Sequence, residues 1–338
     1  MYNMTTTEKH TAKAADIPLP PATDREHLIT VLCGLWMTIG LFLDGYFHQN
    51  LDGTTESFLT PWHAAFYAGF TASALWIGSM SRRRDGGTFD WQLRHLPAGY
   101  ELARAGLVLF AAGAIGDAAW HSAFGVERGV DALLSPTHLL LFVGLVLILT
   151  APFRAATASP TPPSPWMIAG SLVSATALVG FFLNFAWGLG IAVHVRTAYD
   201  PIREIGETQV IAGVASTLVT TVVLFGAARL LTGHRPPPGA FVVLFGVVSL
   251  LVSAAFDEDI EGVLAAVVAG VVLDVLVRTR TPRAVSLAVA SGTMWLIYLG
   301  VLAIDGIQWQ AEIWIGAIVL NTIAAYSITL IAIEERTP

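Results

Sequence analysis

Ten apolar runs, each about as long as a membrane-spanning helix, follow one another along this chain. They lie near residues 28–48, 62–80, 99–121, 137–153, 166–188, 207–231, 239–256, 260–277, 285–304 and 311–333. A helix needs about 20 mainly apolar residues to cross the hydrocarbon core of a bilayer. Only 13% of the 338 residues are charged, whereas a soluble domain has about 25%. The sequence therefore predicts an all-α integral membrane protein with about ten transmembrane helices, surrounded by the lipid bilayer.

The formal net charge of −7 says little about partners, because in a membrane protein the position of the charges matters more than their sum. No nucleic-acid partner is expected. The single cysteine, Cys33, lies inside the first apolar run. A disulfide framework and a cysteine-based metal site are therefore excluded.

Basic residues lie mainly in alternate connections between the runs, which predicts how the chain crosses the membrane. One set of connections, together with both ends of the chain, carries Lys9, Lys13, Arg25, Arg82, Arg83, Arg84, Arg94, Arg154, Arg229, Arg235, Arg278, Arg280, Arg283 and Arg336. The opposite connections carry Arg128, Arg196 and Arg203. Because positively charged loops stay in the cytoplasm, we expect both termini there and five outward-pointing helical hairpins in the cell (plasma) membrane.

Composition also divides the chain into parts. Residues 1–26 are polar and are expected to form a disordered cytoplasmic tail. Residues 155–165 read AATASPTPPSP, which is typical of a proline-rich connector. We therefore expect a four-helix module at 27–154 and a six-helix membrane module at 166–338.

The four-helix module contains an internal repeat, residues 44–63 and 117–138. In each copy an Asp precedes a His by four residues, and an acid, a hydroxyl residue, a proline and a second His follow. The matching residues are Asp44, His48, Glu56, Thr60, Pro61 and His63 in one copy and Asp117, His121, Asp131, Ser135, Pro136 and His138 in the other. The predicted orientation places all of them at the extracytoplasmic ends of the first four spans.

This repeat predicts two metal sites. An Asp and a His four residues apart share one helix face and can reach one ion. A hydroxyl residue followed by proline is typical of a helix start, and the next His then lies in the first turn, where the positive helix end favours the neutral, ligating imidazole. A helical hairpin brings this His back to the preceding Asp and His. The expected ligand sets are Asp44, His48 and His63, and Asp117, His121 and His138.

Two imidazoles and one carboxylate suit copper, zinc or non-haem iron, and three ligands leave a coordination position open. Glu56 and Asp131 are expected either to accept hydrogen bonds from ligand imidazoles or to cap the following helix. A single His near a membrane surface is more often a hydrogen-bonded polar residue than a ligand, and an Asp at the end of a span is commonly solvated. The recurrence of the whole pattern, and the cost of placing ionisable groups at membrane depth without a function, favour metal binding.

The ordered residues Asp44-Gly-Tyr-Phe-His48, Thr60-Pro61-Trp62-His63 and Phe66-Tyr67 resemble the copper-site segment of the C subunit of particulate methane and ammonia monooxygenases. The second copy resembles the second proposed copper site of that subunit, with Asp117 where the family typically has Asn. The resemblance covers residues 28–150 and implies copper at both ligand sets. It also implies further membrane subunits and a partner with cupredoxin domains.

Several functions remain open from the residues alone. The chain could be a copper-dependent oxidoreductase, similar to a monooxygenase subunit, that oxidises a small or apolar substrate with oxygen. It could instead acquire, store or deliver copper outside the cytoplasm without catalysis. A haem-binding protein would leave the Asp of each set without a role, and a structural subunit of a larger complex, in an oligomer with other chains, would need neither site. Metal binding is the prediction common to the first two.

Overall fold

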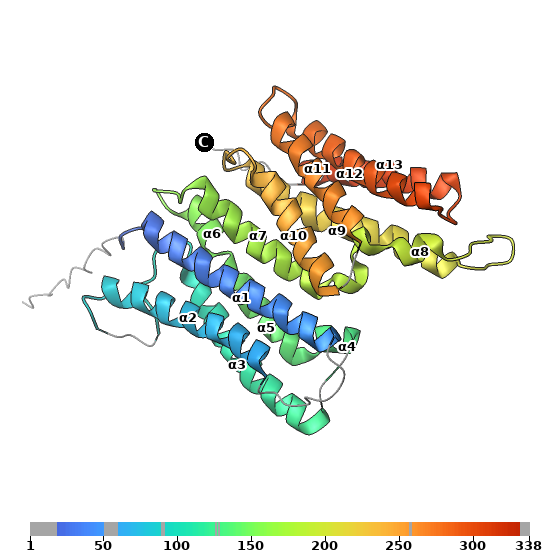
Figure 1. Ribbon diagram of the computed structural model, residues 1–338. Helices are drawn as coiled ribbons and strands as arrows, with labels where there is room; N and C mark the ends of the chain where they lie inside the picture. The colour runs from blue at the N-terminus through green and yellow to red at the C-terminus, as the bar shows by residue number, and fades with distance from the viewer. Residues whose placement is uncertain are drawn as a thin grey trace, which may run out of the picture.

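The computed structural model describes residues 19–50, 60–88, 92–125, 127, 129–256 and 259–331, and these ranges contain helices and no strand. The helices, drawn in Figure 1, are α1 (Asp24–Asn50), α2 (Pro61–Arg84), α3 (Glu101–Phe124), α4 (Val130–Leu134), α5 (Pro136–Leu149), α6 (Ala151–Ala158), α7 (Pro165–Phe182), α8 (Ala192–Arg196), α9 (Glu207–Thr232), α10 (Ala240–Phe256), α11 (Ile260–Leu276), α12 (Arg283–Asp305) and α13 (Ala311–Ile331), with two 3₁₀ turns, η1 (Asn184–Ala186) and η2 (Gly188–Gly190). The prediction of an all-α protein is confirmed for this part of the chain.

Within the described ranges, six helices are long and apolar enough to cross a membrane: α1, α3, α7, α9, α12 and residues 311–330 of α13. The bent pair of α5 and α6 would make a seventh span. Helices α10 and α11 have 17 residues each, and at 1.5 Å per residue that is about 26 Å, slightly less than the hydrocarbon thickness. The count of ten spans therefore stays a prediction.

Helix α1 begins at Asp24, inside the segment expected to be a disordered tail. The reason is a capping box, in which the side chains and backbone amides of two residues three apart satisfy each other. The Thr23 amide donates to Glu26 Oε2 at 2.9 Å, and the Glu26 amide donates to Thr23 Oγ1 at 3.3 Å. Residues 1–18 lie outside the described ranges, so the expected tail is untested there.

The fourth predicted span is broken. Helices α5 and α6 meet at Thr150 with a bend of 44°. Pro152 lies at the start of α6, and a proline inside a helical run removes one backbone donor and clashes with the preceding turn. Helix α6 then continues to Ala158, so the first part of the expected connector 155–165 is helical.

The fifth predicted span is also shorter than the apolar run. Helix α7 ends at Phe182, and η1 and η2 follow over residues that the sequence pattern places in the span. The Asn184 side chain donates to the Phe181 carbonyl oxygen at 2.7 Å, a local bond that competes with the helical pattern. Gly188 then lies against α9, where a Cβ would come within 2.6 Å of the Ser216 carbonyl oxygen.

Helices α1 and α2 form one antiparallel pair and α3 and α5 another. A Cβ at Gly40 would lie 2.8 Å from the Phe66 Cα, and a Cβ at Gly113 would lie 3.0 Å from the Leu141 backbone nitrogen. Each glycine stands four residues before the repeat's Asp, and each contacted residue stands three after its final His. The repeat therefore extends into the packing of the two pairs.

A second glycine in each pair shows the same equivalence. A Cβ at Gly69 would lie 3.0 Å from the Met37 backbone nitrogen, and one at Gly144 would lie 2.7 Å from that of Phe110. Small residues at helix contacts allow two backbones to approach closely in a membrane. The same close approach thus positions both halves of the repeat, which supports its interpretation as a structural duplication.

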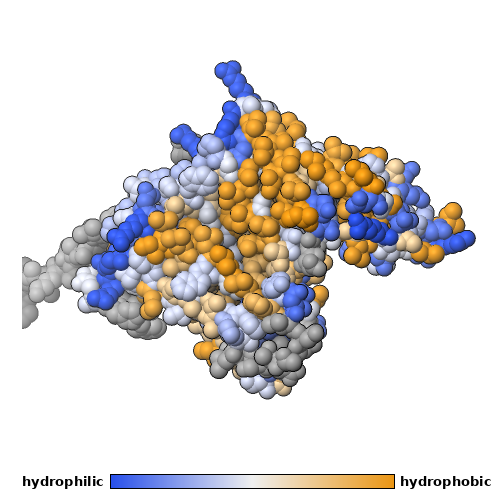
Figure 2. All heavy atoms as spheres, viewed as in Figure 1, coloured by the Kyte–Doolittle hydropathy of each residue, from blue (hydrophilic) through white to orange (hydrophobic). Residues whose placement is uncertain are grey.

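The arginines lie at one end of these helices, and the repeat residues lie at the opposite end. Arg84 at the end of α2 pairs with Glu26 at the start of α1, with an N–O distance of 2.8 Å, and Arg154 of α6 donates to the Gly99 carbonyl just before α3 at 3.1 Å. The repeat's aspartates lie toward the other end of α1 and α3. Figure 2 shows broad apolar areas across the visible face and hydrophilic residues gathered toward its left and right ends.

Candidate metal centre

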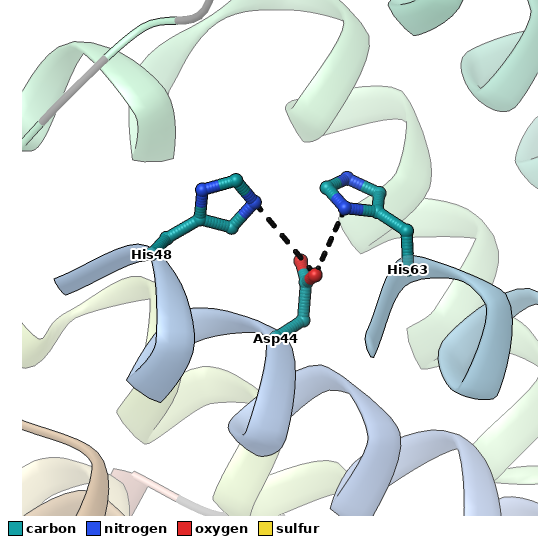
Figure 3. A group of neighbouring side chains, drawn as sticks. All are labelled: Asp44, His48 and His63. Atoms are coloured by element: carbon teal, nitrogen blue, oxygen red, sulfur yellow. Dashed lines mark ion pairs between the residues drawn. The ribbon is translucent and has the colours of Figure 1, made fainter. Parts of the chain in front are cut away.

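The first candidate site joins the end of α1 to the start of α2. Asp44 and His48 lie one turn apart on α1, and His63 lies in the first turn of α2. Figure 3 shows both imidazoles pointing toward the Asp44 carboxylate. Asp44 Oδ1 lies 3.0 Å from His63 Nδ1 and 3.7 Å from His48 Nε2. The predicted ligands of this site are therefore brought together.

The N-cap of α2 holds His63 in place. Thr60 caps the helix, as the sequence predicts, and its hydroxyl oxygen accepts from the His63 backbone amide at 3.2 Å. The same hydroxyl lies 2.9 Å from His63 Nδ1. His63 is buried, whereas the His48 side chain is 38% exposed. The site is thus closed on the α2 side and open to its surroundings at His48.

The second candidate site joins the end of α3 to the start of α5 in the same way. Asp117 Oδ1 lies 3.3 Å from His121 Nε2 and 3.1 Å from His138 Nε2. The Asp117 side chain is 1% exposed. Thr137 Oγ1 also donates to Asp117 Oδ1, at 3.2 Å. One buried carboxylate oxygen is therefore the focus of two imidazoles and a hydroxyl.

Hydrogen bonds at the other ring nitrogens orient these two imidazoles. His121 Nδ1 lies 3.2 Å from the Gly125 carbonyl oxygen, which can only accept, so Nδ1 carries a proton and Nε2 is the ring nitrogen that faces Asp117. His138 Nδ1 lies 2.9 Å from the hydroxyl of Ser135, the predicted N-cap of α5. A lone pair directed at a carboxylate oxygen is stable only with a cation or a proton between them.

The two outer acids of the repeat have different outcomes. Glu56 lies outside the described residues, and Asp131 is exposed in the first turn of α4. Their predicted role as acceptors for ligand imidazoles stays a prediction. The acid that does approach a ligand is Glu127, whose Oε2 lies 3.7 Å from His121 Nδ1. It follows α3 in a connecting segment, where nothing in the repeat pattern marks it.

Two further residues of the site are absent from the sequence prediction. Thr137 stands between Pro136 and His138, so its position in the repeat could have indicated it, but the first copy has Trp62 there, which stacks on Phe47 at 4.7 Å. Tyr67 lies one turn after His63 on α2 and makes a side-chain hydrogen bond to Asp117 of the other site. Its sequence signals were the i, i+4 spacing from a ligand and its place in the Phe66-Tyr67 pair that belongs to the family resemblance.

The donor sets fit a metal ion. In the described part of the chain, the two sets are the groups of three or more His, Cys, Asp or Glu side chains whose ligand atoms all lie within 4.8 Å of one another. Asp44 Oδ1 is buried, and although two imidazole nitrogens face it, it accepts no hydrogen bond of suitable geometry from the described residues. A buried, unsatisfied carboxylate oxygen is costly unless a cation or proton compensates it. The arrangement can therefore hold a cation between two imidazoles and a carboxylate at each site.

The two sites are neighbours. His48 of the first site lies within electrostatic range of His121 and His138 of the second. Aromatic side chains fill the space between α2 and α3: Phe110 of α3 stacks on Phe70 with a ring-centroid distance of 4.1 Å and packs edge-on against Phe66 at 5.5 Å. Whatever binds at one site is therefore close enough to affect the other through these side chains and through its charge.

Compared with protein-family models, with curated proteins and with solved structures, the chain matches none of them. The function is therefore inferred from the residues and their geometry.

Proposed function

We propose that this chain is an integral membrane protein that binds copper at two sites, each made of two imidazoles and one carboxylate, at the extracytoplasmic ends of its first helices. One observation carries the proposal: Asp44, His48 and His63, and again Asp117, His121 and His138, place three ligand atoms within 4.8 Å of one another. That two equivalent helix pairs assemble the same donor set favours a selected binding site over a coincidence of polar side chains.

The membrane arrangement is part of the same proposal: ten spans, both termini in the cytoplasm, and five outward-pointing hairpins. Arg83 and Arg84 pair with Glu26 at one end of α1 and α2, and the first metal site lies at the other end of the same pair. Positively charged ends face the cytoplasm. The sites then face the extracytoplasmic side.

Copper is the metal that the donor set and the resemblance favour together. Two imidazoles and a carboxylate also suit zinc and non-haem iron. The ordered residues of the repeat resemble the copper-site segment of particulate methane and ammonia monooxygenase C subunits, so we place the chain as a distant relative of that subunit over residues 28–150.

The activity that this site supports best is oxidation of a small substrate with oxygen. Bound copper would supply the redox chemistry. The chain's own residues would hold and orient the copper ligands. Thr60 and Ser135 fix the imidazoles of His63 and His138. The partly exposed His48 leaves one side of the first site open to a further ligand. In this proposal electrons come from other subunits, including a cupredoxin-like partner.

Copper acquisition, storage or delivery is the second candidate. It is favoured by the exposure of His48, which offers an incoming ion a first ligand, and by the presence of two similar sites side by side. Such a protein needs accessible ligands and no substrate pocket.

Oxygen uptake separates the two candidates. Copper-loaded protein in lipid nanodiscs is given a reductant and a panel of small substrates, and oxygen and copper are both followed. Substrate-dependent oxygen uptake that disappears in the His48→Ala variant supports the oxidoreductase. Transfer of copper to a chelating acceptor protein without oxygen uptake supports the handling function. A protein that binds no copper under either condition contradicts both.

A further inference from the structure

Tyr67 makes direct contacts to both candidate sites. Its ring stacks on that of His63, with centroids 6.1 Å apart and planes 22° from parallel. Its hydroxyl donates a hydrogen bond to the Asp117 carboxylate of the second site. A tyrosine on α2 thus connects an imidazole of the first site to the carboxylate on which the second is centred.

The surroundings of this ring restrict its movement. Phe110 packs edge-on against the Tyr67 ring at 6.0 Å, and Phe66 lies next to it at 5.4 Å. Aromatic packing of this kind holds a side chain in one rotamer. A movement of the His63 ring should therefore also move the Tyr67 ring and its hydroxyl, because the neighbouring aromatic rings leave no free space for His63 to move alone.

The repeat shows that this contact is specific to one copy. The residue equivalent to Tyr67, four after the final His, is Phe142 in the second copy. Phe142 has no hydroxyl, and its ring packs on Phe182 of α7 at 4.7 Å. Phenylalanine is thus accommodated at the equivalent position of the fold, and the hydroxyl of Tyr67 is the element that the first copy adds.

We propose that Tyr67 is a positioning residue that couples the two metal sites, so that an ion at the first site strengthens binding at the second. The inference rests on the proposed function, because it needs both sites to bind metal. An ion at the first site fixes His63, the fixed imidazole holds the Tyr67 ring that stacks on it, and the held hydroxyl keeps Asp117 oriented toward His121 and His138. By linkage, an ion at the second site strengthens binding at the first by the same factor.

A double-variant cycle tests this coupling. Copper is titrated into metal-free wild type, His48→Ala, Tyr67→Phe and the Tyr67→Phe/His48→Ala double variant. Electron paramagnetic resonance identifies the second-site signal by its loss in His121→Ala. With Tyr67 present, we expect second-site affinity to fall about fivefold or more when His48 is removed. In the Tyr67→Phe background, removal of His48 should no longer lower the second-site affinity.

Two controls keep the result interpretable. Tyr326→Phe, which changes an exposed tyrosine on α13, should leave the coupling factor at its wild-type value. The metal-free Tyr67→Phe protein should unfold at the wild-type temperature to within a few degrees, since Phe142 occupies the equivalent place. An equal coupling factor with and without the Tyr67 hydroxyl overturns the inference and leaves two independent copper sites. Absence of copper binding in the wild type overturns the proposed function as well.

Discussion

The hydroxyl oxygen of Thr60 lies 2.9 Å from Nδ1 of His63, and it also accepts a hydrogen bond from the backbone amide of His63. One side chain therefore both begins α2 and orients a candidate metal ligand. Ser135 likewise caps α5 and lies 2.9 Å from Nδ1 of His138, although there Nε2 faces the carboxylate, whereas at His63 Nδ1 itself does. At both sites, one hydroxyl side chain thus caps the helix and orients the imidazole three residues later.

Thr60→Ala should weaken both the N-cap of α2 and metal binding at the first site. Loss of an N-cap hydroxyl costs about 1 kcal/mol of stability, and loss of a partner that orients a ligand imidazole lowers metal affinity about 10-fold or more. Thermal unfolding in detergent and copper titration of the first site measure the two effects. Thr60→Ser, which installs the residue of the second copy, should retain both, and a Ser variant as weak as the Ala variant would contradict this account.

Asp117→Asn should weaken metal binding at the second site. The carboxylate is nearly fully buried and contacts both imidazoles, so removing its charge removes most of the compensation for a bound cation in a low-dielectric site. We expect affinity for a divalent ion to fall about 10-fold or more, as for removal of other buried charge partners. Asp305→Asn, which changes an exposed carboxylate at the end of α12, is the matched control. Equal affinity in wild type and Asp117→Asn would show that the carboxylate is not a ligand.

Gly40→Ala should separate α1 from α2 and disturb the first site. The new Cβ would lie 2.8 Å from the Phe66 Cα, and overpacking of this kind costs about 1–3 kcal/mol. Gly316→Ala on α13 is the control, because a Cβ there meets nothing within 4 Å. We expect a lower unfolding temperature and weaker first-site copper binding only in Gly40→Ala. If both variants behave alike, the close approach of α1 and α2 does not support the site.

The sites should be reachable from outside the cell and the basic ends from inside. With Cys33 replaced by serine, single cysteines at Ser122, beside the second site, and at Thr88, after the arginines of α2, report the two ends. In right-side-out vesicles a membrane-impermeant thiol reagent should label the Ser122→Cys variant and leave Thr88→Cys unlabelled until the membrane is opened. Labelling of Thr88→Cys alone in sealed vesicles would reverse the proposed orientation.

The local parts of this structure could be predicted from the sequence. Thr60 and Ser135 cap helices, and the Asp-x3-His pairs share a face, because these relationships depend on residues within one or two turns. The bend between α5 and α6 also had a visible signal, since Pro152 stands inside an apolar run. The end of α7 at Phe182, before the end of the apolar run, had no signal in the hydropathy, because the residues of the 3₁₀ turns that follow are also mainly apolar.

The contacts between helix pairs could not be predicted in the same way. Tyr67 meets Asp117, and Phe66 meets Phe110, across residues that are far apart in the sequence. These contacts depend on how close α2 and α3 approach, which local spacing does not determine. The glycines at repeat-equivalent positions, such as Gly40 and Gly113, indicate close packing within each helix pair and give no signal of the contact between α2 and α3.

Metal content tests the central claim most directly. Purified protein loaded with copper and freed of excess is measured by mass spectrometry and by electron paramagnetic resonance, for wild type and for the His48→Ala/His121→Ala variant. The two ligand sets predict about two copper ions per chain with a nitrogen-ligated signal in the wild type, and loss of both ions in the variant. A wild type that retains no copper, or a variant that retains as much as the wild type, would contradict the assignment of these residues as a metal centre.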